Sequence, residues 1–303
     1  MRKTQAATRA SSLYAEVTDR IIAELEAGRL PWVQPWDSAS CGPAMPHNGG
    51  TGRHYSGINV LILWSAVVEG GYSSHRWLTF RQALALGGHV RKGEKGTIVC
   101  YADRFTPRDE AEKARDEDGQ AKAVAFLKRF VVFNVDQCDG LPSELIGAQE
   151  ALGEREAIPH AEALIAATGA EIRIGGGLAF YAPDPDFVQV PPQQYYPHQI
   201  NWYRTLLHEL GHWTGHSSRL GRVQSGFLGG AAYAREELVA ELTSAFTCAS
   251  LAIQPTVRHS DYIGAWLDVL RGDDKAIFRA ASAASKAADY LLAFAPDREN
   301  GHG

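Results

Sequence analysis

The segment WYRTLLHELGH, residues 202–212, contains two histidines separated by three residues, with a glutamate directly after the first. Residues four apart lie on one face of a helix, so His208 and His212 can bind one Zn²⁺ ion. Glu209 projects beside them, where its carboxylate can accept a proton from metal-bound water. The apolar residues before the motif predict that it lies on a partly buried helix. The segment therefore predicts a metallopeptidase-like site; two surface histidines on an ordinary helix are the alternative interpretation.

A catalytic zinc site needs a third protein ligand and an open position. Residues 233–241, YAREELVAE, offer two glutamates four apart, and we expect Glu237 to be the ligand while Glu241 orients a histidine. The reverse assignment of these two residues stays open. Glu236 is expected to face solvent. His216 is an alternative ligand, although its place after the helix favours a turn residue that caps the helix end.

The identity of the metal and the course of the reaction follow from this ligand set. Zn²⁺ is the expected ion, with Mn²⁺ and Co²⁺ as alternatives, and Glu209 is the expected general base. Ser218 occupies the position at which a metzincin has its third histidine, so a gluzincin-like peptidase is indicated. An extended peptide substrate is expected to pair with strand 178–182 or strand 187–190. Four side chains are candidates for holding the oxyanion: Tyr195, Tyr196, His198 and Tyr233.

Length and composition limit the class of protein. The chain has 303 residues, of which 45% are hydrophobic and 21% charged, which excludes global disorder. No apolar stretch is long enough for a bilayer span, and no apolar region follows the basic N-terminus, so neither a membrane partner nor a signal peptide is predicted. The four cysteines are far apart in the sequence, which favours a reducing, cytoplasmic location over a disulfide framework.

Periodicity and turn signals predict an α+β fold of two domains. The expected domains are residues 1–140 and 158–303, joined by a linker over 141–157. The second is expected to be a small sheet followed by helices that carry the two histidines. Helices are predicted over 11–27, 57–69 and 158–168, with a short one after Thr79 and several from residue 197 onward. Strands are predicted over 97–102, 124–135, 171–174, 178–182 and 187–190, and the charged stretch 107–122 is predicted to be a hairpin tip or insertion.

The first half of the chain mixes aromatic and basic residues. Residues 1–140 have 18 Lys and Arg against 16 Asp and Glu, while the whole chain has a net charge of −5. Proteins that bind single-stranded nucleic acid use flat rings for the bases and cations for the phosphates, largely without regard to sequence. Core packing of the tryptophans and ordinary surface cations are the alternative. The candidate contacts are Trp32, Trp36, Arg53, Tyr55, Trp77, Arg81, Arg91, Lys92 and Lys95.

Several segments carry a family resemblance: PWVQPW at 31–36, YSGIN at 55–59, WLTFRQA at 77–83, KGEKG at 92–96 and FVVFNVDQ at 130–137. Together with residues 208–220 and 233–241, they make the chain resemble the ArdC-type antirestriction proteins over almost its whole length. The resemblance implies an N-terminal domain that binds single-stranded DNA and a C-terminal zincin-like metallopeptidase domain. It also implies protection of incoming conjugative plasmid DNA from the restriction enzymes of the recipient bacterium.

Three hypotheses about function remain open at this point. In the first, a DNA-binding antirestriction protein also cleaves or contacts a protein of a restriction system. In the second, the protein binds DNA and its metal site is structural. In the third, the chain is a metallopeptidase with no role in nucleic-acid binding. We prefer DNA-binding antirestriction, with peptidase activity undecided.

Overall fold

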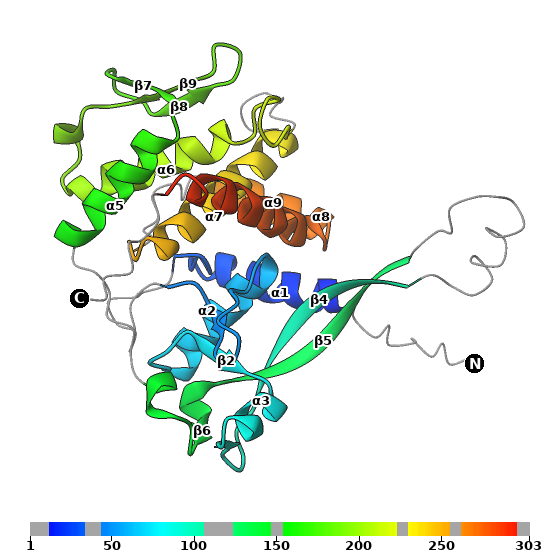
Figure 1. Cartoon of the computed structure of the whole chain (residues 1–303). Helices are drawn as coiled ribbons and strands as arrows, with labels where there is room; N and C mark the ends of the chain where they lie inside the picture. Colours follow the sequence, from blue (N-terminus) through cyan, green and yellow to red (C-terminus); the bar gives the residue numbers. More distant parts are fainter. Residues whose placement is uncertain are drawn as a thin grey trace, which may run out of the picture.

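The computed structural model describes residues 12–33, 44–105, 124–146, 154–222, 230–254 and 262–295. It has the predicted α+β class, with helices and small sheets in both halves (Figure 1). None of the described helices is long and apolar enough to cross a bilayer. Cys100, Cys138 and Cys248 are buried free thiols, as the cysteine spacing predicts.

The N-terminal half is built around a four-stranded sheet of order β1-β2-β5-β4. Its helices are α1 (Leu13–Glu26), α2 (Ile58–Gly70) and α3 (Phe80–Ala85). Its strands are β1 (His47–Asn48), β2 (Arg76–Leu78), β3 (His89–Val90), β4 (Thr97–Phe105), β5 (Val124–Asn134) and β6 (Cys138–Asp139). The side chain of Ser12 accepts from the backbone of α1, and Thr79 and Gln82 form a capping box on α3, so the cap residues set these helix starts.

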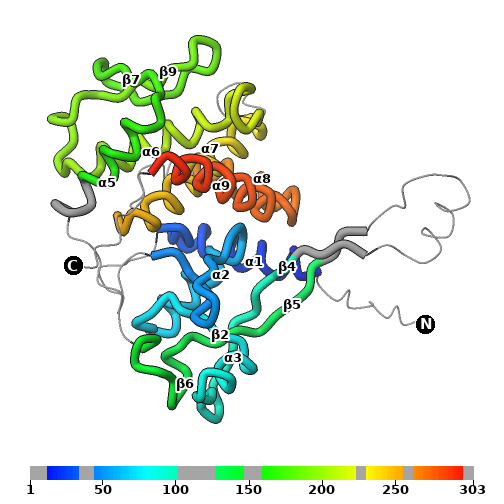
Figure 2. Tube along the Cα trace, in the orientation of Figure 1, coloured from blue at the N-terminus to red at the C-terminus, as the bar shows by residue number. Residues whose placement is uncertain are grey.

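The C-terminal half places a three-stranded sheet of order β7-β9-β8 beside a bundle of helices. The strands are β7 (Glu171–Ile174), β8 (Phe180–Ala182) and β9 (Phe187–Val190). The helices are α5 (Glu154–Ala167), α6 (Gln199–Trp213), α7 (Ala231–Ser250), α8 (Ile263–Gly272) and α9 (Ala276–Leu292). In Figure 2 the trace runs from the end of α5 directly into this sheet.

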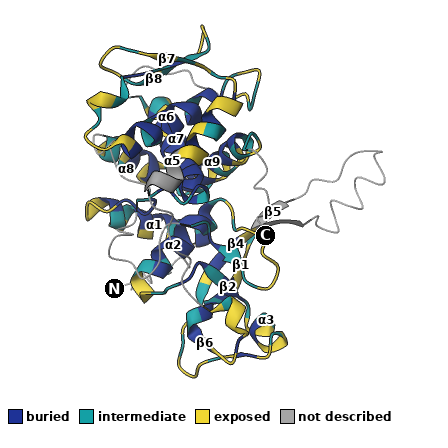
Figure 3. Ribbon diagram, turned by 60° about the vertical axis from the view of Figure 1, so that its left-hand side comes forward, coloured by how far each residue is buried: buried dark blue, intermediate teal, exposed yellow. Residues whose placement is uncertain are grey.

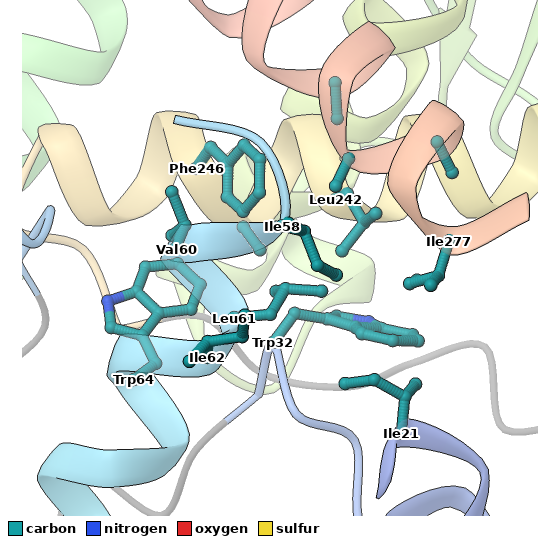
Figure 4. Packing of buried hydrophobic residues seen from close by; sticks show 14 of the residues in the cluster. Ile21, Trp32, Ile58, Val60, Leu61, Ile62, Trp64, Leu242, Phe246 and Ile277 are labelled. Atoms are coloured by element: carbon teal, nitrogen blue, oxygen red, sulfur yellow. The ribbon is translucent and has the colours of Figure 1, made fainter. Parts of the chain in front are cut away.

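One hydrophobic cluster contains residues from both halves of the chain. Helices α1 and α2 lie between the C-terminal helices and the N-terminal sheet, and buried residues of both sides meet there (Figures 1 and 3). Trp32 packs edge-on against Trp266 with ring centroids 5.5 Å apart, and Trp64 packs against Phe246 at 5.7 Å. Figure 4 shows Leu242 and Phe246 of α7 facing the side chains of α2. The helix α7 is therefore buried on the side toward α2 as well as on the side toward α6.

Two details of the predicted elements differ from the structure or lie outside it. The helix predicted to open at Ile158 begins a turn earlier, at Glu154, so Pro159 lies inside α5. Pro159 has no N–H group, so the carbonyl of Arg155 in the first turn of α5 lacks its helical hydrogen bond. The charged stretch 107–122 lies outside the described residues. The division into domains at 140 and 158 stays a prediction.

Candidate functional site

The two histidines lie where α6 packs closely against α7. Gly211, between them, permits this approach, since a Cβ atom there would lie 3.2 Å from the Cα of Ala240 and 3.3 Å from the Cβ of Thr243. Such contacts are tighter than packed helices normally make, so a side chain at this position would push the helices apart. The glycine thus sets how near the face of α6 with His208 and His212 comes to the carboxylates of α7.

Three ligand atoms converge between these helices. His208, His212 and Glu237 each offer an atom within 4.8 Å of the others. The Nε2 atom of His208 lies 3.5 Å from Oε2 of Glu237, and Nε2 of His212 lies 3.5 Å from Oε1 of the same carboxylate. The sequence motif and the preferred glutamate are therefore brought together in one largely buried cluster, in which His212 keeps some exposure.

The other nitrogen of each histidine faces an outer carboxylate. Nδ1 of His208 lies 3.9 Å from Oε1 of Glu241, and Nδ1 of His212 lies 3.4 Å from Oε1 of Glu236. Glu241 thus lies on the side of His208 away from Glu237, as an orienting residue does. The expectation that Glu236 faces solvent is wrong, because its side chain is buried against His212.

Arg222 holds Glu236 in place. Its Nη2 atom donates to Oε1 of Glu236 at 2.8 Å and to the carbonyl of Gly211 at 2.6 Å, while Nη1 donates to Oγ1 of Thr214 at 2.8 Å. The guanidinium therefore connects the end of α6 to the start of α7. Charge-assisted hydrogen bonds of this kind are about twice as strong as neutral ones, so they fix the carboxylate beside His212.

The proximity of these charges controls protonation. Burial acts to raise the pKa of Glu237, but hydrogen bonds with His208 and His212 outweigh it and hold the pKa well below its usual range. Burial also acts to lower the pKa of His212, but its bonds with Glu236 and Glu237 raise the pKa to about 10. Glu237 therefore stays ionised at neutral pH, which suits a metal ligand.

The cluster fits a divalent metal ion by its donor chemistry. Two imidazole nitrogens and one carboxylate are a known ligand set of catalytic zinc sites, which leave a fourth position open. Glu236, 3.4 Å from Nδ1 of His212, lies where the outer partner of a metal-ligating ring is expected, and Glu241 lies on the corresponding side of His208 at 3.9 Å. His208, His212 and Glu237 are the only such group in the part of the chain that the structure describes.

The cluster opens into a cleft of about 270 Å³ that also contains Glu209. Glu209 is buried and lies on the same helix as the two histidines. The hydroxyl of Tyr233 lies 3.2 Å from that of Tyr262, and both rings line the cleft. Burial and the bond to Tyr262 raise the pKa of Tyr233, so its hydroxyl stays protonated and can donate to an oxyanion.

Some expected contributors to this site lie elsewhere. His216 is in the turn after α6, where its Nδ1 atom lies 2.7 Å from the hydroxyl of Ser218, as expected for a turn residue. Tyr195 is largely exposed, in a short helical turn before α6. Sequence analysis missed Tyr181 and Tyr262, which line the cleft but have no motif around them.

A strand edge borders the same cleft. Ala179, Phe180 and Tyr181 line it, and β8 is an edge strand of the sheet. β9 lies between β7 and β8 and is paired on both sides, so the expectation of a free edge at 187–190 is wrong. Strand 178–182 alone of the two candidates can pair with a peptide.

The tryptophans chosen as nucleic-acid contacts are core residues. Trp32 and Trp77 have 0% of their surface exposed, so their choice as stacking platforms is wrong. Trp32 packs on Trp266 and Trp77 on Tyr72, which leaves no ring face for a base. Trp36 lies outside the described residues.

The other candidate contacts differ in accessibility. Arg53, Arg81, Lys92 and Lys95 are exposed, and Tyr55 is half-buried. Arg91 is exposed as well, but its guanidinium pairs with Glu94 at 2.7 Å and with Asp139 at 3.5 Å. A cation neutralised in this way contributes less to phosphate binding.

Comparison with known families divides the chain into two matches. Residues 11–133 match the family described as the N-terminal domain of anti-restriction factor ArdC, and residues 159–283 match the zincin-like metallopeptidase family. Among similar proteins, y4eC of Sinorhizobium fredii is 40% identical over 294 residues, which are 95% of this chain and 94% of that protein. The DNA primase TraC of Escherichia coli is 39% identical over 298 residues, 93% of this chain but 27% of that protein.

Two solved structures resemble the chain throughout. The metal-free structure of the antirestriction protein ArdC from plasmid R388 is 41% identical, has a TM-score of 0.78, and matches 94% of this chain and 98% of that one. The Mn(II)-bound structure of the same protein is 40% identical with a TM-score of 0.77, over 95% of this chain and 100% of that one. That the relative binds a divalent ion agrees with the donor set described above.

Proposed function

The chain belongs to the family of ArdC antirestriction proteins, and on that premise we propose that it binds single-stranded DNA and protects incoming conjugative plasmid DNA from restriction in the bacterial cytoplasm. The N-terminal half is the DNA-binding part in this proposal. The C-terminal half is a metal-dependent peptidase that acts on a protein of the restriction system.

One observation supports the catalytic part of the proposal above all. The buried cluster of His208, His212 and Glu237 adjoins Glu209 in a cleft that is open to solvent. A structural metal site is closed by four protein ligands and has no need of a glutamate beside the open position. We propose Zn²⁺ as the native ion on the strength of the two histidines and one glutamate, with Mn²⁺ and Co²⁺ as the alternatives.

Each group in the cleft has a separate role in the proposed hydrolysis of a peptide bond. His208, His212 and Glu237 would hold the ion, which would supply a polarised water and a Lewis acid for a carbonyl oxygen. Glu209 takes the proton of the attacking water and passes it to the leaving amine. Tyr233, held by Tyr262, donates a hydrogen bond to the oxyanion. The backbone of β8 pairs with an extended peptide and aligns it along the cleft.

Replacement of Glu209 in a conjugation assay tests this function. The transfer of a restriction-sensitive plasmid is compared between wild type and Glu209→Gln at equal protein level, with oligonucleotide binding measured on both. Loss of protection with DNA binding and metal binding intact is the expected result. Full protection by Glu209→Gln would refute the catalytic role and favour a protein that acts by binding alone.

Point variants are needed for this test because the two halves share a core. Removal of residues 1–140 would expose Leu242, Phe246 and Trp266, which pack against the N-terminal half. A truncated chain would then lose protection through unfolding alone. A salt-sensitive shift of a labelled single-stranded oligonucleotide, measured on the whole chain, separates the proposal from a peptidase without a role in DNA binding.

A further inference from the structure

A groove of about 320 Å³ lies beside the β4–β5 hairpin, remote from the metal cluster in sequence and lined by none of its residues. One wall is the turn that contains Asn48, Arg53, His54 and Tyr55, and the other is one face of the two long strands. Its volume lies in the range of small-molecule sites. In Figure 1 the two strands run side by side past α2.

The register of the hairpin places two aromatic side chains on this face. Val99 is opposite Phe130, and Tyr101 is two residues further along the same strand, so the three side chains share one face. Val99 is buried at the floor of the groove, whereas Tyr101 is 58% and Phe130 46% exposed. Their rings meet edge-on with centroids 6.2 Å apart. Because the ring planes stand 86° apart, a flat ligand can stack on the face of one ring while the other ring contacts its edge.

The opposite wall supplies positive charge from a rigid turn. The side-chain oxygen of Asn48 accepts from the backbone of Gly50 and Thr51 and from Nε2 of Gln82, at 3.0–3.1 Å. Arg53 and His54, on this turn, line the groove, and within the described residues neither has a carboxylate partner. An exposed guanidinium next to aromatic rings suits a ligand that has both a flat ring and a phosphate.

The other face of the hairpin has the opposite character. Ile98 is exposed there, and the hollow beside it is lined by the carboxylates of Glu16, Glu24 and Glu69. The two arginines of that face are both paired, Arg129 with Glu16 at 2.8 Å and Arg20 with Glu69 at 2.5 Å, so their charges are neutralised. Carboxylates repel phosphates, so of the two faces, as far as the described residues extend, the one with Tyr101 and Phe130 combines aromatic rings with available positive charge.

We propose that this groove is a nucleobase-stacking subsite, in which a base of single-stranded DNA stacks on one of the rings of Tyr101 and Phe130 and meets the other at its edge, while its phosphate contacts Arg53 and His54. The proposal rests on the proposed function, since it locates the DNA binding assigned there to the N-terminal half. Stacking uses the ring face that every base has, so binding at this subsite is tolerant of sequence.

Substitutions on the two faces of the hairpin test the proposal. Binding of a fluorescein-labelled 20-residue oligothymidylate to the full chain is measured by anisotropy for Y101A/F130A and for the matched control I98A/V131A. The control removes two exposed side chains from the opposite face of the same strands. We expect the first variant to bind about tenfold more weakly or worse and the control to bind as wild type does. Tyr101→Trp, which enlarges the ring, is expected to keep or strengthen binding.

The salt dependence of oligonucleotide binding separates phosphate contacts from base stacking. Arg53→Ala is expected to reduce the slope of log affinity against log salt by about 0.7, the value for one phosphate of a single strand. Y101A/F130A should weaken binding with little change of that slope. Unchanged melting temperatures confirm that both variants are folded.

The outcomes distinguish this proposal from the function on which it rests. If wild type fails to bind the oligonucleotide, the proposed function itself is wrong. If wild type binds and Y101A/F130A binds equally well, DNA binding stands but its place in this groove is refuted. Equal weakening by I98A/V131A would also refute it, because the loss would then not depend on the aromatic face.

Discussion

The cluster of His208, His212 and Glu237 between α6 and α7 and the groove beside β4 and β5 differ in how their side chains are held. His208 and His212 each lie between two carboxylates, and one of these carboxylates is itself held by Arg222. Tyr101 and Phe130 contact one another and are half exposed. Removal of one cluster residue leaves a buried charge without its partner, whereas removal of a groove ring leaves only water in its place.

Because of this difference, substitutions in the two regions should affect the free energy of unfolding and the ligand affinity differently. In the cluster, one substitution should change both metal affinity and the free energy of unfolding, because the same contacts serve both. In the groove, substitutions should change DNA affinity alone. Substitutions in the hydrophobic core between the two regions are a third case. They should change the free energy of unfolding, while neither the metal ion nor the DNA loses a contact.

The largest effect is expected for Trp32→Ala. Trp32 is fully buried against Trp266, and replacing a buried tryptophan by alanine costs about 3–5 kcal/mol. Because the hydrophobic cluster around Trp32 contains residues of both halves, urea unfolding of the variant should remain one transition, with its midpoint at a lower urea concentration. The oligonucleotide affinity of the folded variant should equal that of wild type. A loss of DNA affinity without a loss of stability would restore Trp32 as a DNA contact.

The next largest effect is expected for Glu237→Ala. This carboxylate lies 3.5 Å from Nε2 of both histidines, so its loss should weaken Mn²⁺ or Zn²⁺ binding by more than about 100-fold, the upper end for outer partners. Calorimetric titration of the protein with Mn²⁺ or Zn²⁺ measures this affinity. DNA affinity should stay unchanged. If Glu241→Ala instead gives the larger loss, the roles of the two glutamates are exchanged.

The metal cluster was accessible to sequence analysis because covalent spacing determines much of it. Four residues along a helix bring His208 and His212 to one face whatever surrounds them. The same spacing relates Glu237 to Glu241, and the structure places the first between the histidines. The starts of α1 and α3 could also be predicted, because the N-cap residues Ser12 and Thr79 act on backbone groups only a few positions away.

The groove and the outer shell of the cluster depend on contacts between distant segments. Tyr101 and Phe130 are 29 residues apart in the sequence and share a face only through the pairing of β4 with β5, and nothing local marks them as exposed. Trp32 and Trp77 have the composition of stacking residues but are covered by the core. Glu236 is buried because Arg222 reaches it from the turn after α6, a contact that no helical period predicts.

A smaller effect is expected for Glu236→Gln, which keeps the shape but removes the charge beside His212. Loss of an outer partner typically lowers metal affinity about 10–100-fold, or about 1.4–2.7 kcal/mol. Titration with Mn²⁺ measures the change, and Glu144→Gln, on an exposed residue of the N-terminal half, is the control. Affinity equal to wild type would mean that the Nδ1 contact at 3.4 Å does not orient the ring.

The smallest effect is expected for Asp186→Asn, at a residue that contacts the cleft through Tyr181. Arg219 donates from Nη1 to Oδ2 of Asp186 at 3.0 Å, and Asp186 also accepts from the hydroxyl of Tyr181, which lines the cleft. These bonds lower the pKa of Asp186, the one to Arg219 most of all. The side chain of Asp186 is 34% exposed, so solvent screens the pair and the substitution should cost about 1 kcal/mol at pH 7.

The pH dependence of that cost identifies the ion pair as its source. A carboxylate with a lowered pKa stabilises the folded chain above the pKa of the unfolded form, about 3.9, and loses this contribution as the pH falls through its folded pKa. The difference in unfolding free energy between wild type and Asp186→Asn should therefore be constant from pH 7 to about 5 and be lost as the pH falls through the lowered pKa of the folded form. Asparagine tolerates the positive φ of 52° at this position, so the substitution adds no backbone strain. A difference that persists at low pH would assign the stabilisation to the hydrogen bond with Tyr181 instead of the charge on Arg219.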